Sequence, residues 1–249
     1  MEANGKSGQI GRRRFLGSTA ALGAAAAGLT ACAGGAVKTT PATQERAPRK
    51  IAGMNALLIN THLPYPGWSE GKLNASAQAA AREFFEDRGD SVVETHVASG
   101  YDAAAEEKKF LAADAIIVQM PVNWFSAPWI WKKYVDEVFN VGLHNGSFLT
   151  GDGRTRSDPT KPYGSGGLMA PRRVLVCSTW NAPREAFDAP ANPVFRGMSL
   201  DTALAEITAP FRFCGFEVLP GFAFLDIFKN PKIKEDLEAY RAHLAAQFA

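Results

Sequence analysis

The chain has 249 residues, of which 46% are hydrophobic and 21% charged, and its formal net charge at pH 7 is +2. This length suits one domain of roughly 200 residues with a sizeable buried core. The near-balanced charge gives no reason to expect a nucleic-acid partner, and three cysteines are too few for a disulfide framework.

The N-terminal segment, residues 1–35, has the layout of an export signal. Arginines precede a weakly apolar run of Ala and Gly, and the letters RRRFL beginning at Arg12 resemble the twin-arginine motif. An ordinary basic leader is the alternative. The letters LTAC ending at Cys32 resemble a lipobox, in which Cys32 would carry lipid, although an incidental small residue near a cleavage site is also compatible.

These features predict export through the twin-arginine route, as a periplasmic protein or a membrane-anchored lipoprotein, with a cytoplasmic location if the signal does not function. A transmembrane anchor is disfavoured because the apolar stretch is short and broken by glycine. Residues 36–50 are polar and contain proline, which predicts a flexible linker before a folded domain at 51–249.

From residue 51 onward, short apolar runs alternate with amphipathic segments. We predict strands at residues 54–60, 91–97, 115–120, 173–179 and within 216–228, and helices at 73–88, 102–113, 128–141, 200–214 and 232–248. Five such βα units predict an α/β fold of the flavodoxin-like kind, a doubly wound five-stranded parallel sheet with helices on both faces. The Gly- and Pro-rich stretch 142–171 is long for a structureless loop, which indicates a function.

The segment from Gln119 to Phe139 combines a buried strand, an aromatic loop and a helix, and it holds three of the five tryptophans. Ligands of parallel sheets bind at the carboxyl ends of the strands, where this loop is expected. Loop amides and Asn123 could bond the polar edge of a planar ring, with Trp124 and Phe125 as walls. The alternative is that these aromatics are core or interface anchors. The part from Trp129 to Phe139 is expected to be helix core and a dimer contact.

Two further loops follow strand ends. In the first, Ser69, Gly71, Lys72 and Asn74 open a helix without a dinucleotide or P-loop motif, and free amides there would bind an anion. A lysine at a helix start opposes the dipole, so Lys72 favours that anion, although a solvated lysine is equally compatible.

The second loop begins at Thr179. Thr179 and Asn181 could bond a ring's polar rim and Trp180 could stack on it, or Asn181 could cap a helix.

The loop at 152–167 offers glycines for close backbone approach, the basic residues Arg154, Arg156 and Lys161 for phosphates, and Tyr163 as a ring neighbour or proton donor. An exposed charged loop is the alternative.

The sequence shows no set of side chains that would catalyse a reaction without a cofactor. The four histidines show no metal-ligand spacing, no G-x-S-x-G is present, and Cys177 and Cys214 are expected to be buried packing thiols. This favours an enzyme whose cofactor performs the reaction.

Four blocks carry a family resemblance. QMP, APW and KKY within 119–139, DGRTR and YGSGGL within 152–168, TWNAP with EAF within 179–187, and the pattern over 237–244 resemble the NADPH:quinone reductases of the modulator-of-drug-activity-B type. The resemblance implies FAD, NADPH as donor, two-electron reduction of quinones to quinols with hydride relayed through flavin N5, and a homodimer with the active site at the interface. It implies Tyr163 as a catalytic residue. It also implies flavin contacts at Ser69, Glu70, Gly71, Lys72, Leu73, Asn74, Ala75, Ser76, Pro121, Val122, Asn123, Trp124, Tyr163, Thr179, Trp180, Asn181 and Ala182.

The chain departs from that family in three respects. Val122-Asn123 stands where the family has Gly-Trp, Lys72 replaces a neutral residue, and the family is usually cytoplasmic. The export signal leaves a second hypothesis open, an exported flavodoxin-fold electron carrier or a non-catalytic flavin-binding partner protein.

Overall fold

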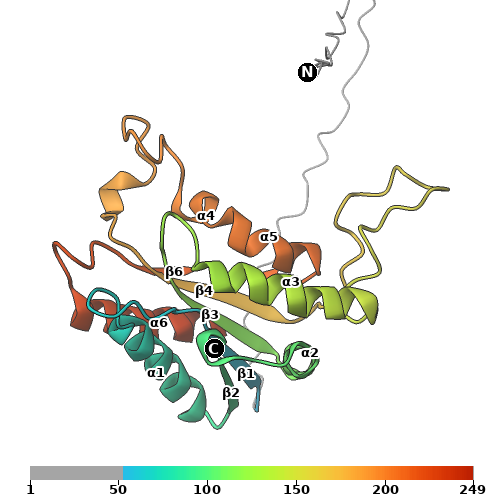
Figure 1. The fold of residues 1–249 in the computed structure, drawn as a ribbon, viewed down its shortest axis with the longest axis horizontal. Helices are drawn as coiled ribbons and strands as arrows, with labels where there is room; N and C mark the ends of the chain where they lie inside the picture. The colour runs from blue at the N-terminus through green and yellow to red at the C-terminus, as the bar shows by residue number, and fades with distance from the viewer. Residues whose placement is uncertain (1–52, 249) are drawn as a thin grey trace, which may run out of the picture. The chain divides into compact units, whose positions relative to one another are not determined.

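The computed structural model of the protein describes residues 53–248, and the predicted signal, lipobox and linker lie outside them. The described part contains a parallel sheet with helices on both faces (Figure 1). The strands are β1 (Asn55–Asn60), β2 (Ser91–His96), β3 (Ala115–Pro121), β4 (Arg173–Thr179), β5 (Glu217–Val218) and β6 (Phe222–Phe224). The order is β2-β1-β3-β4-β5, with β6 also pairing with β4. The predicted fold class is confirmed.

Two hydrophobic clusters bury the two faces of the sheet. On one face lie α1 (Lys72–Glu86) and α6 (Ile233–Phe248), which pack Phe85, Tyr240 and Phe248 against β1, β3 and β4. On the other face lie α2 (Ala103–Ala112), α3 (Trp129–His144), α4 (Leu200–Ala203) and α5 (Ala205–Phe213), with short 3₁₀ turns at Val97–Ser99 (η1) and Arg184–Ala186 (η2). Every residue of β3 is buried, as expected of a central strand covered on both faces.

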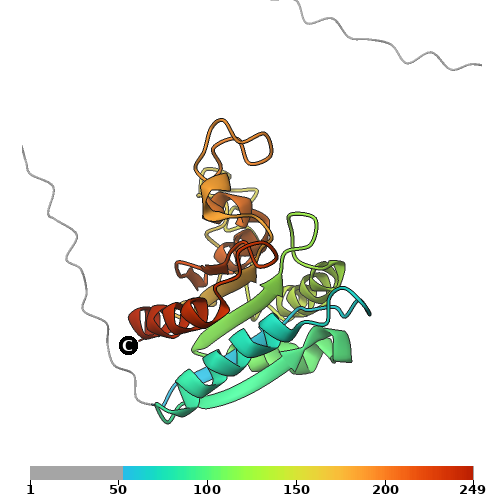
Figure 2. The same cartoon turned by 90° about the vertical axis from the view of Figure 1, so that its left-hand side faces the viewer.

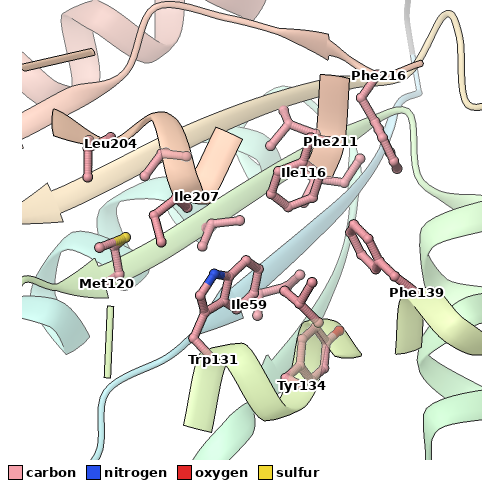
Figure 3. Close-up of a cluster of buried hydrophobic side chains, with 14 of the residues drawn as sticks. Ile59, Ile116, Met120, Trp131, Tyr134, Phe139, Leu204, Ile207, Phe211 and Phe216 are labelled. Atoms are coloured by element: carbon pink, nitrogen blue, oxygen red, sulfur yellow. The ribbon is translucent and has the colours of Figure 1, made fainter. Parts of the chain in front are cut away.

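Figure 3 shows how α3 and α5 fill the second face. Trp131 stacks on Tyr134 with ring centroids 5.6 Å apart, and Phe139 packs edge-on to Phe211 at 5.5 Å. The Tyr134 hydroxyl donates to the buried Glu106 carboxylate at 2.7 Å, so the polar end of this ring is satisfied. The helix-core role predicted for Trp131 through Phe139 is confirmed, whereas Trp129, at the first turn, is exposed.

The last strand is interrupted, which the sequence prediction missed. Arg173 pairs with Glu217, but Cys177 pairs with Phe222, so one extra residue lies on the edge strand between β5 and β6. Pro220 lies in this interruption and has no amide hydrogen to offer the ladder, a position where edge strands tolerate proline and bulges. The predicted helix 200–214 is likewise divided, because Leu204 leaves helical geometry with φ −99° and ψ 10°.

Both described cysteines are buried, as predicted. Burial raises the pKa of the Cys214 thiol to about 12 and raises that of Cys177 further. Neither thiol is a reactive nucleophile in this environment.

Candidate functional site

A pocket of about 400 Å³ lies at the carboxyl ends of the strands, between loops that are far apart in sequence. Figure 2 shows the same edge of the sheet, with the β3–α3 loop in green and the β1–α1 loop in cyan. The loop between β1 and α1 supplies one wall, the β3–α3 loop a second, and the ends of β4 and β6 a third. The lining residues are Trp68, Ser69, Glu70, Gly71, Lys72, Leu73, Asn74, Pro121, Val122, Asn123, Trp124, Thr179, Asn181, Ile227 and Phe228.

Helix α1 starts in this pocket without a side-chain cap. Its N-cap residue, Gly71, has φ 75°, no side chain caps the first turn, and no acidic residue lies there. The first free amides of the helix, from Lys72 to Asn74, therefore belong to pocket-lining residues and keep the positive end of the helix dipole without a partner. Such a helix start is an anion-binding arrangement.

Gly71 is also required by packing. A Cβ at this position would lie 2.4 Å from the ring of His62. His62 lies 3.3 Å from the Ser69 hydroxyl, and partial burial lowers the pKa of the imidazole. The neutral ring thus supports the turn that presents the helix start.

Lys72 does not stand alone, contrary to the reasoning from the sequence. Its ammonium pairs with the Glu70 carboxylate at 2.7 Å, and both side chains are exposed. The pair holds the pKa of Glu70 below its usual range and raises that of Lys72. The lysine therefore needs no further anion to balance it, and the uncapped helix start is the stronger indication of an anion site.

Polar groups are buried directly behind the pocket. The Gln119 amide donates to Asn74 Oδ1 at 2.8 Å, and Asn74 lines the pocket. Within residues 53–248, Gln119 Oε1 and Thr61 Oγ1 have no hydrogen-bond partner although both are buried. Unpaired buried acceptors are costly in a folded protein, and Gln119 is connected to the pocket through its bond to Asn74.

The β3–α3 loop contains a tight turn with unusual residues. Asn123 and Ser126 exchange backbone hydrogen bonds of 2.8 and 3.2 Å, and the two central residues, Trp124 and Phe125, have φ values of 50° and 71°. Positive φ at both positions is what a type I′ turn requires, and Asn-Gly is the usual occupant. Two bulky aromatics held there represent backbone strain, which is typical of functional sites.

This turn displays its aromatic side chains. Trp124 is 94% exposed at the pocket rim, which rules out the core-anchor alternative for it, and Phe125 packs edge-on to Phe195 at 5.9 Å. Among residues 53–248, no acceptor receives the amide hydrogens of Trp124 or Phe125. The turn therefore offers two free donors and an aromatic surface at the same place.

The segment after β4 is arranged differently from the prediction. Thr179 is buried and Asn181 is exposed, and both line the pocket. Trp180 is buried against Phe187 and Phe195 and donates from its indole nitrogen to the Ser178 hydroxyl at 2.8 Å. Trp180 therefore cannot stack on a ligand in the pocket, because its ring is part of the core.

Some predicted contacts lie outside the pocket. Ala182 and Trp180 line a neighbouring cavity instead. Ala75 and Ser76 are exposed on the first turn of α1, where the Ser76 hydroxyl donates to the Lys72 carbonyl at 3.0 Å. Neither residue faces the pocket, because only the beginning of the helix points into it.

The structure also adds residues that the prediction did not include. Trp68 stacks on Tyr65 with centroids 5.2 Å apart and is exposed at the rim, and Phe228 is exposed on the opposite side. Trp68 directly precedes Ser69 in the loop that was predicted to open a helix, so a large aromatic residue in a ligand-binding loop was an available signal. Phe228 follows the last strand, where the same rule about carboxyl ends would have pointed to it.

Tyr163 lies far from this pocket within the same chain. Helix α3 runs back toward the amino ends of the strands, so the 145–170 excursion begins at the opposite edge of the sheet, as the yellow loop in Figure 1 shows. Tyr163 is 71% exposed and packs on Phe213 at 5.3 Å, with the Arg154 guanidinium 5.2 Å from the ring centroid. The expected contact between Tyr163 and the pocket does not occur in one chain. Arg154 pairs with Asp152 rather than facing the pocket.

Comparisons with known proteins agree with the fold. A family model described as a flavodoxin-like fold matches residues 54–248. The NADPH:quinone oxidoreductase MdaB of Haemophilus influenzae is 38% identical over 195 residues, covering 78% of this chain and 100% of that protein.

Among solved structures, a protein assigned as a quinone reductase from Klebsiella pneumoniae has a TM-score of 0.64 at 22% identity, covering 79% of this chain and 85% of that chain. General stress protein 14 of Treponema denticola, in complex with FMN, has a TM-score of 0.54 at 19% identity, covering 78% and 98%. At these identities the structural matches show the fold alone. The sequence match carries the assignment further: the chain belongs to the flavodoxin-like fold family and, within it, to the group that includes MdaB.

Proposed function

We propose that the protein is an NADPH:quinone oxidoreductase that binds FAD in the pocket at the strand ends and reduces quinones to quinols by two electrons. The observation that carries the proposal is the combination in one pocket of an uncapped helix start and a strained turn that displays Trp124 at the pocket rim. The first suits a phosphate group and the second suits a planar ring. The name of the Haemophilus influenzae relative supports the same reaction.

The residues of the pocket fit a flavin. Its volume of about 400 Å³ lies within the range of small-molecule sites, roughly 300–1,000 Å³. The free amides of α1 would hold a phosphate, and those of Trp124 and Phe125 would bond the polar edge of the ring. The Asn74–Gln119 pair, with its unpaired acceptor, would hold a further polar group.

A bound flavin would supply the redox chemistry, accepting a hydride from NADPH and passing it to a quinone. The chain's own groups would bind and orient the reactants. The Trp124 indole would form an apolar wall beside the reacting ring, and the neighbouring backbone donors would stabilise negative charge on it. Val122, where the resembled family has glycine, narrows the pocket floor on the side of Thr179, to whose carbonyl it donates at 2.9 Å.

FAD is proposed over FMN because room for a second nucleotide adjoins the helix start. A smaller cavity of about 250 Å³ is lined by Gly67, Trp68, Glu70 and Lys72, three of which also line the main pocket. The exposed Trp68 ring would stack on a base there. Chromatography of the flavin released by denaturation distinguishes the two cofactors, and release of FMN alone would refute this part.

A homodimer is proposed to bring Tyr163 to the pocket of a second copy. The residue is exposed at the sheet edge opposite its own pocket, so it can act on a flavin only across an interface. Mixing a Tyr163→Phe chain with a Trp124→Asn chain, at an FAD concentration too low to load the latter, tests this arrangement, because restored turnover in the mixed dimer requires one intact site built from both copies.

Export through the twin-arginine route is proposed from the RRRFL run alone. Replacing Arg12 and Arg13 with lysine should retain the protein in the cytoplasm, measured by cell fractionation with the unchanged chain as control. Equal distribution of the two forms would refute the export proposal.

The test of the whole function is direct. The purified protein should carry flavin, and it should oxidise NADPH continuously when a benzoquinone is added. An electron carrier or a non-catalytic flavin protein would show flavin without sustained NADPH oxidation. Protein purified without flavin that also fails to bind added FAD would refute both readings.

A further inference from the structure

We propose that a groove beside the pocket binds an apolar chain attached to the quinone ring, so that the substrate class is chain-bearing quinones rather than bare rings. This inference rests on the proposed function. The groove lies between the strained Trp124-Phe125 turn and the segment 187–199, which follows η2 and forms the orange loop projecting at the same end of the molecule as the β3–α3 loop (Figure 1).

The groove consists of two cavities that adjoin one another. Their volumes are about 390 and 540 Å³, and both are lined by Trp124, Phe125, Val194 and Phe195. The first also shares Val122, Trp124 and Asn181 with the main pocket. A molecule whose ring lies against Trp124 in the main pocket therefore lies next to the groove, with Trp124 as a common wall.

The lining is suited to hydrocarbon. Most of its side chains are apolar, and the polar exceptions are Asn181, Asn192, Ser126, Thr202 and Glu206. Glu206 is the only charged residue among them, and the groove otherwise presents carbon atoms. Burying an apolar chain there would be favourable in proportion to the area removed from water.

The outer wall of the groove is a fixed structure. Phe187 and Phe195 are buried with ring centroids 4.4 Å apart, and both pack on Trp180. The Asn192 carboxamide oxygen accepts from the amides of Val194 and Phe195 at 3.0 and 2.9 Å. These hydrogen bonds fix the backbone of the loop at Val194. The Val194 side chain is 51% exposed.

Met198 extends the same wall. Its carbonyl accepts from the Asp188 amide at 2.9 Å, which closes the base of the loop, while its side chain is exposed in the second cavity. A flexible thioether is well suited to contact ligands of varying shape. Trp124, Phe125, Val194 and Met198 thus form one apolar surface that the core does not use, adjoining the redox pocket.

The test compares quinones that share one ring and differ only in the chain. The holoenzyme is assayed with a dimethoxy-methyl-benzoquinone bearing no chain and with the same ring bearing one or two isoprenyl units. We expect kcat/KM to rise about 10-fold or more with the chain, mainly through KM, since burying about two methylene groups in an apolar site already corresponds to roughly 10-fold.

Two variants place a charge in the groove, Val194→Asp and Met198→Asp. Each should lower the ratio of kcat/KM for the chain-bearing quinone over the bare quinone by about 10-fold, bringing it toward unity. Val93→Asp is the matched control, because Val93 is 47% exposed on β2, far from the groove. The control should keep the wild-type ratio.

Three outcomes would overturn the inference. The first is a wild-type ratio of kcat/KM, chain-bearing over bare quinone, near one. The second is an unchanged ratio in both groove variants. The third is an equal loss of kcat/KM for both quinones together with a smaller species in sedimentation, which would assign the groove to a second copy of the chain. Quenching of tryptophan fluorescence by the same quinones separates this inference from the proposed function. Chain-dependent binding without NADPH oxidation would retain the groove and reject the reductase.

Discussion

The Trp124-Phe125 turn yields the most direct prediction about how this site is built. We expect Trp124→Asn to stabilise the flavin-free protein while weakening flavin binding. The Trp124 backbone is held at φ 50°, a left-handed conformation that bulky residues adopt at a cost. Asparagine tolerates this conformation and is the usual first central residue of a type I′ turn.

The magnitude follows from exposure and backbone strain. The left-handed conformation costs a non-glycine residue about 1–2 kcal/mol, and asparagine avoids much of this. Because the Trp124 side chain is 94% exposed, its removal forfeits almost no buried area. The net gain should be about 1 kcal/mol, which corresponds to a rise in Tm of about 2–4 °C for a domain of this size.

The same substitution should weaken the binding of the flavin. An aromatic stacking partner contributes about 0.5–1.5 kcal/mol, so losing Trp124 should weaken FAD binding by about 3- to 10-fold. Thermal unfolding of the flavin-free protein and titration of that protein with FAD measure the two effects separately. Thermal unfolding must be measured without flavin, because a bound ligand raises Tm by itself.

Trp129→Asn is the matched control. Trp129 is an exposed tryptophan at the first residue of α3, where the backbone is helical and unstrained. The control should therefore show no gain in Tm. If Trp124→Asn melts at or below the wild type without flavin, the strain argument is wrong. If it is more stable and still binds FAD equally well, the turn is strained for a reason unrelated to flavin.

Three further predictions concern other parts of the site. Gly71→Ala should destabilise the protein by more than about 1 kcal/mol and weaken FAD binding, because its Cβ would meet the His62 ring at 2.4 Å. The control is Gly67→Ala, where φ is 85° but the space around a Cβ is open, so that only the backbone cost applies. Equal losses of stability for the two variants in urea unfolding would contradict the packing argument. The pKa of His62 is lowered in the folded state from 6.5, so protonation favours the unfolded chain and stability should fall as the pH drops below 6.5. His62→Asn should reduce the slope of unfolding free energy against pH in unfolding titrations. An unchanged slope would assign the pH dependence to other groups. Tyr163→Phe should lower quinone turnover by roughly 10²-fold if the phenol donates a proton; unchanged turnover would leave Tyr163 a positioning role only.

The sheet was predictable because its signals are local. The apolar run of β3 is buried at every residue, and the strand and helix periods alternate regularly, which fixes a parallel α/β fold. The position of the pocket followed from the same rule, since ligands bind at the carboxyl ends of such strands. The helix start at Lys72 and the loop at Asn123 were found for that reason.

The errors have specific physical causes. Trp180 was expected to stack on a ligand, but its indole is buried, since Phe187 and Phe195 from the following loop cover it and that loop's path cannot be read from sequence. The strained turn was missed because Trp-Phe is not a sequence that predicts a type I′ turn. The position of Tyr163 outside its own chain's pocket follows from topology: a helix that follows a parallel strand returns to the amino edge, so the excursion after α3 begins away from the pocket. Its predicted role at a homodimer interface stays a prediction.

The strand-end pocket combines several features that are unfavourable in the empty fold. The helix α1 is uncapped, Gln119 Oε1 and Thr61 Oγ1 lack partners within residues 53–248, and Trp124 and Phe125 occupy left-handed backbone. Each of these features destabilises the empty fold by roughly 1 kcal/mol or more. A sequence under no constraint but folding would replace them with a capping serine, a paired side chain and an Asn-Gly turn. The uncapped helix start and the turn at Trp124 both line the pocket. Their retention is explained if a ligand with a phosphate and a flat polar-edged ring satisfies both, and a flavin nucleotide has both groups.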